Sequence, residues 1–491
     1  MNIQSPVSTA LDFSRSEFEA RLNQVSQMIL RRFDRLDGPA FCGNSPSEVA
    51  SWFDELPPED MGNLDALLER VEKQVMDTAT LNIGPNMYAY VMAGGTQLSI
   101  LAEMIVATLN QNVGKWHLAP VMTELERRVI IWAADTIGFA KEAAGTLVSG
   151  GSAANLQGLT VARNLFLQAK GLAGKGLSGQ PPLVIYASEE VHSCVDKSAE
   201  MLGIGTDYLR KIPVDADYRI LVDVLRARIE ADKAAGLQPF CLIGNAGTVN
   251  TGAIDPLDEL ADIAEAHDLW FHVDGAYGGF PAMLPSMQAA YKGLDRADSV
   301  AIDFHKWLYQ PFEAGCIIVR EWSSLRKAWY KRATYLASDP SDDGRIDFNE
   351  HSFQLSRNAK ALKIWMTYQY FGLEKLRAAI QNDIDNAAYL AELSESAPAF
   401  RCIHHGPLGI TCFQYVPAGE YSEDQLNALN RALIPALEKD GRVFITGTHL
   451  KGQDVIRACC INHRQTRADM EHLLHVIRDV GEGMLRNAFF S

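Results

Sequence analysis

The sequence has few cysteines, and they follow no regular spacing. Among its 491 residues are eight cysteines, of which only Cys459 and Cys460 are adjacent. No CxxC pair occurs, so the sequence suggests neither a metal site nor a disulfide framework. We therefore expect a protein of a reducing compartment, the cytoplasm.

Long apolar runs and an excess of positive charge are absent as well. The most apolar stretches, Leu98–Leu109 and Val129–Ala140, are too short and too interrupted by polar residues to span a bilayer. The first residues lack the basic and then apolar segments of a secretory signal. A formal net charge of -16 disfavours non-specific attraction to nucleic acid or to an anionic membrane. A hydrophobic content of 47% is ordinary for a globular α/β protein of two or three domains.

Residues 1–80 show a helical pattern. Phe18, Leu22, Val25 and Ile29 are spaced three or four apart, as on one face of a helix. Pro57 and other breaks divide the segment into several helices, which would bury little on their own. We expect this N-terminal segment to pack on a second subunit.

Residues 81–365 alternate short apolar runs with helical stretches such as Leu221–Ala234 and Pro256–His267. Such runs, separated by helices, are typical of a mostly parallel sheet covered on both faces. The pattern beyond a boundary near residue 365 predicts a smaller α+β domain, residues 366–491. The apolar runs that we expect to be strands of the large sheet are Leu183–Tyr186, Phe240–Ile243, Leu269–Val273, Ser299–Ile302 and Cys316–Val319.

A glycine-rich turn precedes one of the predicted helices. Gly150, Gly151 and Ser152 open the helical pattern of Leu156–Leu167. Glycine lets backbone N–H groups approach an anion, and a helix start adds unpaired donors. The turn therefore predicts a phosphate cradle, with an ordinary turn capped by Ser152 as the alternative. It matches neither GxGxxG nor the P-loop, so nucleotide binding has no support.

Three further polar residues follow predicted strands. Asp274 ends a buried strand, where a carboxylate needs a partner such as a protonated pyridine nitrogen. Lys306 follows Ser299–Ile302 and could form a Schiff base with a cofactor aldehyde. His192 follows Leu183–Tyr186 and could stack on an aromatic ring. Alone, each residue has an ordinary structural alternative. Together, at successive strand ends of one α/β scaffold, they predict a single site.

These residues, in this order, resemble the group II PLP-dependent amino-acid decarboxylases, which include aromatic-amino-acid, glutamate, histidine and diaminobutyrate decarboxylases. The resemblance implies a pyridoxal-5′-phosphate (PLP) cofactor, an amino-acid substrate and a type I, aspartate-aminotransferase-like fold. It also implies an obligate homodimer with the active site at the subunit interface. The motifs that carry the resemblance are Trp116–Glu126, Ser149–Asn155, His192–Ser193, His272–Gly278 and His305–Trp307.

The resemblance also implies roles for individual residues at the phosphate and the lysine. Gly151 and Ser152 would hold the cofactor phosphate, and His305 would touch it. Lys306 would carry the cofactor as a Schiff base. Asp303 stands where several relatives have a phosphate-facing asparagine, and we assign it no ligand role.

Around the ring, the resemblance implies four more contacts. His192 would stack on the pyridine ring near the substrate carboxylate, and Ala276 would pack under the ring. Asp274 would pair with the ring nitrogen, and Asn245 would lie near the cofactor. The residues that would line the substrate pocket are Tyr90, Met92 and His117, a set that favours an aromatic or apolar substrate side chain.

One residue departs from the aromatic branch of the family. There, a mobile loop supplies a tyrosine thought to return a proton to the substrate, and alignment places Phe348 at that position in this sequence. Phenylalanine cannot donate a proton. In some relatives it accompanies oxidative deamination to an aldehyde. Alternatively, Phe348 packs structurally, and Tyr335, His351 or water supplies the proton. We expect simple decarboxylation to an amine, with aldehyde synthesis as the alternative.

Overall fold

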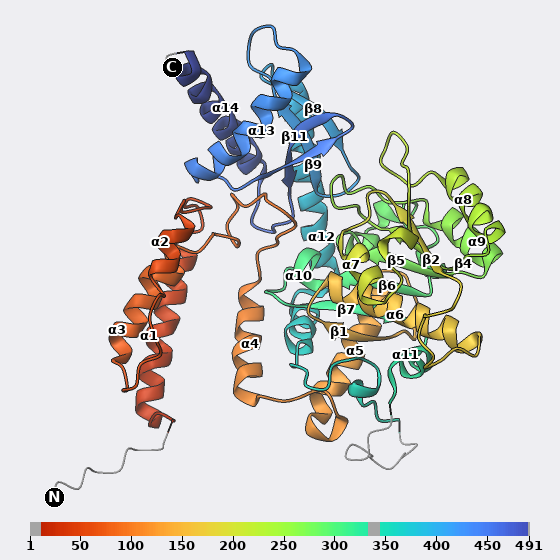
Figure 1. The fold of residues 1–491 in the computed structure, drawn as a ribbon. Helices are drawn as coiled ribbons and strands as arrows, with labels where there is room; N and C mark the ends of the chain where they lie inside the picture. The colour runs from red at the N-terminus through yellow and green to blue at the C-terminus, as the bar shows by residue number, and fades with distance from the viewer. Residues whose placement is uncertain (1–10, 332–343, 490–491) are drawn as a thin grey trace, which may run out of the picture.

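The computed structural model describes residues 11–331 and 344–489, and a seven-stranded sheet lies at its centre (Figure 1). The strand order is β1-β7-β6-β5-β4-β2-β3. Five strands are parallel to one another, in the order β6, β5, β4, β2 and β3. Strand β7 is antiparallel to both of its neighbours, β1 and β6. The predicted mostly parallel sheet is confirmed. Its strands are β1 (Ala144–Val148), β2 (Leu183–Ser188), β3 (Leu209–Ile212), β4 (Gln238–Asn245), β5 (Trp270–Gly275), β6 (Ser299–Asp303) and β7 (Gly315–Val319).

Helices cover both faces of this sheet because its strands are apolar on both sides. In β2, Ile185 and Ala187 pack in one apolar cluster with α6 and α7, while Val184 and Tyr186 pack in another with α5, α8 and α9. Near-continuous apolar strands require such a two-sided cover. The covering helices are α5 (Pro120–Thr136), α6 (Gly151–Ala169), α7 (Cys194–Met201), α8 (Val222–Ala234), α9 (Leu257–His267) and α11 (Trp322–Trp329).

A four-stranded antiparallel sheet, in the order β10-β11-β9-β8, forms the smaller C-terminal part. The long helix α12 (Ala361–Ser396) leads into it, with a non-helical residue, Gly372, at φ 69°. The predicted boundary near residue 365 therefore falls inside a helix, and the domain limits stay a prediction. The other elements are β8 (Phe400–His405), β9 (Ile410–Tyr415), α13 (Glu423–Asp440), β10 (Thr446–Leu450), β11 (Gln453–Cys459) and α14 (Arg467–Phe489).

The N-terminal helices stand apart from the sheet in Figure 1. They are α1 (Arg15–Phe33), α2 (Pro46–Ser51) and α3 (Leu64–Arg70), followed by a π-helical turn at Val71–Met76. In α1 only Met28 is buried, and Phe18, Leu22 and Val25 are exposed. The predicted helical pieces are present, but within one chain their apolar residues lie open to solvent.

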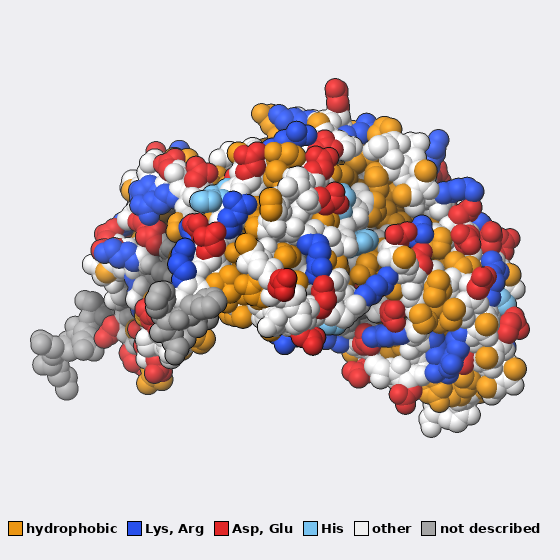
Figure 2. All heavy atoms as spheres, turned by 90° about the horizontal axis from the view of Figure 1, so that it is seen from above, with side chains coloured by type: hydrophobic (Ala, Val, Ile, Leu, Met, Phe, Trp, Pro, Cys, Tyr) orange, Lys and Arg blue, Asp and Glu red, His pale blue; other side chains and the backbone are white. Residues whose placement is uncertain are grey.

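The surface carries both charge signs side by side. On the face drawn in Figure 2, acidic and basic side chains are interspersed, with apolar patches between them. Within residues 11–331 and 344–489, no helix is long and apolar enough to cross a membrane.

Candidate active site

Three neighbouring strands deliver polar residues to one edge of the large sheet. Asn245 ends β4 and lies directly opposite Asp274 near the end of β5. Asp303 ends β6, and the short helix α10 (Phe304–Trp307) follows at once and carries Lys306. Carboxyl ends of parallel strands form the usual ligand site of such sheets. The structure therefore brings Asn245, Asp274 and Lys306 to a common edge.

Lys306 is held by an acidic neighbour. Its Nζ lies 2.9 Å from Oδ2 of Asp303, whose side chain is almost fully buried. His305 Nε2 lies 3.6 Å from the same oxygen. Burial lowers the pKa of His305, and the negative charge of Asp303 partly opposes that shift. Among the described residues, Oδ1 of Asp303 has no hydrogen-bond partner.

The glycine turn packs against the same residues. Gly151 is the first residue of α6, and among the described residues no side chain makes a cap hydrogen bond at Gly150 before it. The first N–H groups of a helix have no partner within the helix and attract anions. A Cβ on Gly151 would lie 2.6 Å from the Ala276 Cβ and 3.0 Å from Oδ2 of Asp303. The close approach explains why glycine is needed at this position. Ser152, next in the turn, is exposed.

We expect Gly151→Ala to weaken cofactor binding by at least about tenfold, because the added methyl must displace Ala276 or Asp303. Overpacking of this kind costs about 1–3 kcal/mol of unfolding free energy. Equilibrium binding of PLP and thermal unfolding measure the two effects. The control is Gly483→Ala in α14, where a Cβ meets none of the described atoms within 4 Å. That change should leave binding intact, and equal binding by both variants would contradict the cradle.

Asp274 is buried beside the turn, with Oδ1 accepting a hydrogen bond from the Ala276 N–H at 3.1 Å. Its charge acts on the buried thiol of Cys194, at the start of α7. Burial and Asp274 together raise the pKa of Cys194 to about 12. Asp274 therefore places a negative charge in a largely dry site, where such a charge calls for a positive partner.

A buried histidine, for which the sequence analysis predicted no role, links the elements of this site. His272 Nδ1 lies 2.8 Å from Ser299 Oγ, and its Nε2 lies 2.8 Å from Asn155 Oδ1. Because an amide oxygen only accepts, Nε2 carries a proton, and in the neutral ring Nδ1 accepts the Ser299 hydroxyl. Burial lowers the pKa of His272 to about 4, which agrees with that form. The network fixes β5, β6 and α6 to one another; no local sequence signal reveals it.

The other predicted ring contacts are placed less directly. The side-chain amide of Asn245 donates to Asp255 Oδ2 at 2.9 Å, so this group is already bonded within the protein. His192 is exposed in the loop after β2, and its Nδ1 accepts the Cys194 N–H at 3.1 Å. Its exposed ring is free to stack on a ligand. Their roles toward the cofactor stay predictions.

The predicted substrate-pocket residues lie on either side of one helix in the sequence. Tyr90 and Met92 precede α4 (Gln97–Leu109), and His117 follows it in the 3₁₀ turn Trp116–Leu118. Thirteen helical residues span about 20 Å. Thr96, at the start of α4, donates its N–H to Tyr309 O at 3.0 Å, close to Lys306 in sequence. Tyr90 and Met92 therefore lie toward the Lys306 end of the helix, and His117 lies toward the other end.

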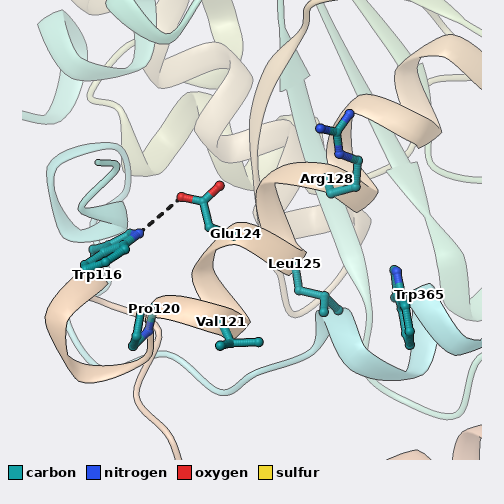
Figure 3. A pocket seen from close by; sticks show the side chains of 7 residues that line it. All are labelled: Trp116, Pro120, Val121, Glu124, Leu125, Arg128 and Trp365. Atoms are coloured by element: carbon teal, nitrogen blue, oxygen red, sulfur yellow. Dashed lines mark hydrogen bonds between the residues drawn. The ribbon is translucent and has the colours of Figure 1, made fainter. Parts of the chain in front are cut away.

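Close to His117, an open apolar pocket of about 450 Å³ lies between the starts of α5 and α12 (Figure 3). Trp116 donates its Nε1–H to Glu124 Oε1 at 3.1 Å across one side of it. None of its lining residues is a predicted cofactor contact. They are Trp116, Pro120, Val121, Glu124, Leu125, Arg128 and Trp365.

Phe348 is a core residue in the structure. It is 0% exposed, and its ring packs against Trp322 and beneath the guanidinium of Arg357. This placement agrees with the structural alternative for Phe348 and does not offer its ring to a substrate. The resemblance predicts a loop at 338–348 that ends at Phe348; its residues 338–343, and Tyr335 before it, lie outside the described residues. His351 is buried, with its Nδ1 2.9 Å from Asp347 O.

Comparison with known proteins agrees with this geometry. Residues 46–416 match the pyridoxal-dependent decarboxylase conserved domain. An aromatic-L-amino-acid decarboxylase of Bacillus atrophaeus is 32% identical over 97% of this chain and 98% of its own length. A phenylacetaldehyde synthase of Arabidopsis thaliana is 29% identical over 87% of each chain. The fold matches a crystal structure of Oryza sativa TDC with PLP and tryptamine, with a TM-score of 0.91, 24% identity and coverage of 97% of this chain and 100% of that one.

The residues at the sheet edge fit a phosphorylated pyridine aldehyde. The uncapped start of α6 suits a phosphate, the carboxylate of Asp274 suits a protonated ring nitrogen, and Lys306 supplies an amine. The mostly parallel sheet with its small antiparallel partner is the type I fold of PLP enzymes. The chain belongs to the pyridoxal-dependent decarboxylase family and is a PLP-dependent enzyme.

Proposed function

We propose that this protein decarboxylates an L-amino acid to the corresponding amine, with the cofactor carried on Lys306. The observation that carries the proposal is the common sheet edge at which Lys306, Asp274 and the start of α6 meet. An aromatic substrate is supported by the name of the Bacillus relative and by the aromatic rings of Tyr90 and His117 among the predicted pocket residues.

Each residue of the site has a proposed role that follows from its position. When bound, the cofactor supplies an electron-accepting ring that stabilises the charge left at the substrate Cα as CO₂ departs. The Asp274 carboxylate would hold the proton on the ring nitrogen, and Gly151 with the first turn of α6 would bind the phosphate. The exposed imidazole of His192 would contact the ring. Lys306 Nζ would hold the cofactor between turnovers and exchange a proton with the substrate amine.

The product is the point on which similar proteins divide, since one is named as a decarboxylase and another as an aldehyde synthase. We favour the amine because Phe348, whose place in the sequence suggested the aldehyde, is buried in the core. The test is a screen of amino acids that measures CO₂, amine, aldehyde, peroxide and ammonia together. We expect CO₂ and amine in equal amounts; peroxide and ammonia in step with CO₂ would establish the aldehyde synthase instead.

The variant Phe348→Tyr further distinguishes decarboxylation to an amine from aldehyde synthesis. We expect an unchanged ratio of amine to aldehyde and a loss of about 1–3 kcal/mol in stability, because the new hydroxyl is buried without a partner. Phe353→Tyr, at an exposed ring in the same segment, is the control and should change neither. A shift of product from aldehyde to amine in Phe348→Tyr alone would show that residue 348 acts on the substrate.

A homodimer accounts for two features of the single chain. The apolar residues Phe18 and Leu22 of α1, and Leu101, Met104 and Ile105 of α4, are exposed. Large exposed apolar patches mark interaction surfaces. His117 follows α4 whereas Tyr90 precedes it, and a second copy could bring both residue types to one pocket. We expect Phe18→Glu to lower the apparent mass in size-exclusion chromatography and to reduce turnover. Asn23→Glu, which adds the same charge at an exposed polar position, should change neither; an unchanged mass in Phe18→Glu would contradict this use of α1.

A further inference from the structure

Asp303 places a buried carboxylate against the predicted phosphate cradle. It is 2% exposed, and its Oδ1 has no hydrogen-bond partner among the described residues. A Cβ on Gly151 would lie 3.0 Å from Oδ2, and one on Gly315 would lie 2.7 Å from Oδ1. Both carboxylate oxygens therefore pack against the glycine turn and β7. This side chain therefore lies against the first turn of α6, where we predict that the phosphate binds.

The groups that face Asp303 come from four elements. From α10, Lys306 Nζ lies 2.9 Å and His305 Nε2 lies 3.6 Å from its Oδ2. From α6 come the backbone of Gly150 and Gly151 and the positive end of the helix. From β7 comes the buried thiol of Cys316, whose pKa burial raises above its usual value and the charge of Asp303 raises further. On its own strand, β6, its neighbours are apolar. Among the described residues, Lys306 is thus the lysine that pairs with this carboxylate.

We infer that binding of the cofactor is coupled to the uptake of one proton from solvent, which Asp303 then holds. The inference rests on the proposed roles of Lys306 and of the cradle. A phosphate monoester brings nearly two negative charges at neutral pH. Lys306 leaves its ion pair with Asp303 when it takes up the cofactor aldehyde. A buried carboxylate would then face an anion without its cation, and like charges at short range disfavour ionisation.

Protonation of Asp303 removes the repulsion between its carboxylate and the phosphate, and it turns the side chain into a hydrogen-bond donor. A protonated Asp303 has one O–H donor, which a phosphate oxygen can accept, and its charge is gone. The proton comes from solvent, and no other bond in Asp303 changes. Asp303 is then a positioning residue for the phosphate, and its effect should be visible in the proton balance of binding, even where turnover is not measured.

The experiment is calorimetric titration of the cofactor-free full-length protein with PLP. Buffers of different ionisation enthalpy give the number of protons taken up on binding. We expect the wild-type protein to take up about one proton more than Asp303→Asn between pH 7.5 and 8.5. The wild-type dissociation constant for PLP should accordingly rise about tenfold per pH unit relative to that of the variant. Because Asp303→Asn also removes the charge beside Lys306, the pH dependence of covalent attachment at Lys306 is measured in both proteins, and the Lys306 proton that it gives is subtracted from each.

Two control variants locate the proton. Asp298 lies just before the opposite end of β6, where its Oδ2 accepts the Phe271 N–H at 2.8 Å, and Asp298→Asn should keep the extra proton. His305→Gln should keep it as well, because His305 already binds Ala314 through Nδ1 at 3.1 Å. Loss of the extra proton in His305→Gln, with its retention in Asp303→Asn, would assign the proton to His305 and overturn the inference.

The inference and the proposed function fail in different ways. Equal numbers of protons taken up by wild type and Asp303→Asn on PLP binding would overturn the inference. If PLP were still bound to Lys306 in both proteins, the proposed function would remain supported. Borohydride reduction followed by peptide mapping identifies the lysine that carries PLP in each protein, and label on another lysine would overturn the function. Asp303→Ser serves as a second neutral variant if Asp303→Asn does not accumulate as folded protein.

Discussion

Lys306→Ala should abolish the visible absorption of the bound cofactor and lower turnover by at least about 10⁴-fold. The loss is large because a covalent anchor has no substitute once its amine is gone. The same change leaves Asp303 buried without its cation, and breaking such a pair costs about 3–5 kcal/mol. Loss of activity in Lys306→Ala alone could therefore reflect unfolding, so a second variant is needed.

Lys306→Arg provides that second variant. The guanidinium keeps a positive charge within reach of Asp303, yet it does not form the covalent link. We expect a folded protein without visible absorption and with the same loss of turnover. Lys211→Ala is the control, because Lys211 also pairs with an aspartate, at 2.8 Å, but at the partly exposed strand β3. Borohydride labelling should mark Lys306 in the wild type. Full absorption in Lys306→Arg would remove Lys306 from the central role.

The strands with a clear chemical pattern could be predicted from the sequence. The five apolar runs correspond to β2, β4, β5, β6 and β7. Strand β1 has the sequence Ala-Gly-Thr-Leu-Val and β8 has Phe-Arg-Cys-Ile-His-His, which lack a β-branched apolar run. Both are strands because neighbouring strands pair with them, and short-range sequence patterns do not contain that information.

The candidate site shows the same limit. Strand ends and a glycine turn predicted the edge that holds Asp274, Lys306 and Gly151, because parallel strands bring their carboxyl ends together. The ion pair of Lys306 with Asp303 depends on how β6 turns into α10. The environment of Phe348 depends on Trp322 and Arg357, which come from other segments. Contacts between distant segments therefore decide which residues of a motif face the ligand.

Asp274→Asn should lower turnover by about 10²–10³-fold while PLP stays bound to Lys306. Removing a preorganised electrostatic partner in a dry site has effects of this size. Asparagine keeps the shape of the side chain and can still accept the Ala276 N–H, which Asp274 Oδ1 accepts at 3.1 Å. What it lacks is the negative charge that would hold a proton on the ring nitrogen. The defect should therefore appear in the turnover number at saturating PLP rather than in protein stability.

Two further variants test whether turnover depends on the negative charge of Asp274. Asp274→Glu restores the charge on a longer side chain and should recover part of the turnover, which a purely structural role for Asp274 would not predict. Asp298→Asn makes the same chemical change at the opposite edge of the sheet and should leave turnover near the wild-type value. If Asp274 acted only through packing, Asp274→Asn and Asp274→Glu would lose similar amounts of turnover. If its negative charge acts on the ring, Asp274→Glu should retain more turnover than Asp274→Asn. The proton on the ring nitrogen needs a carboxylate beside it, and an amide cannot replace one.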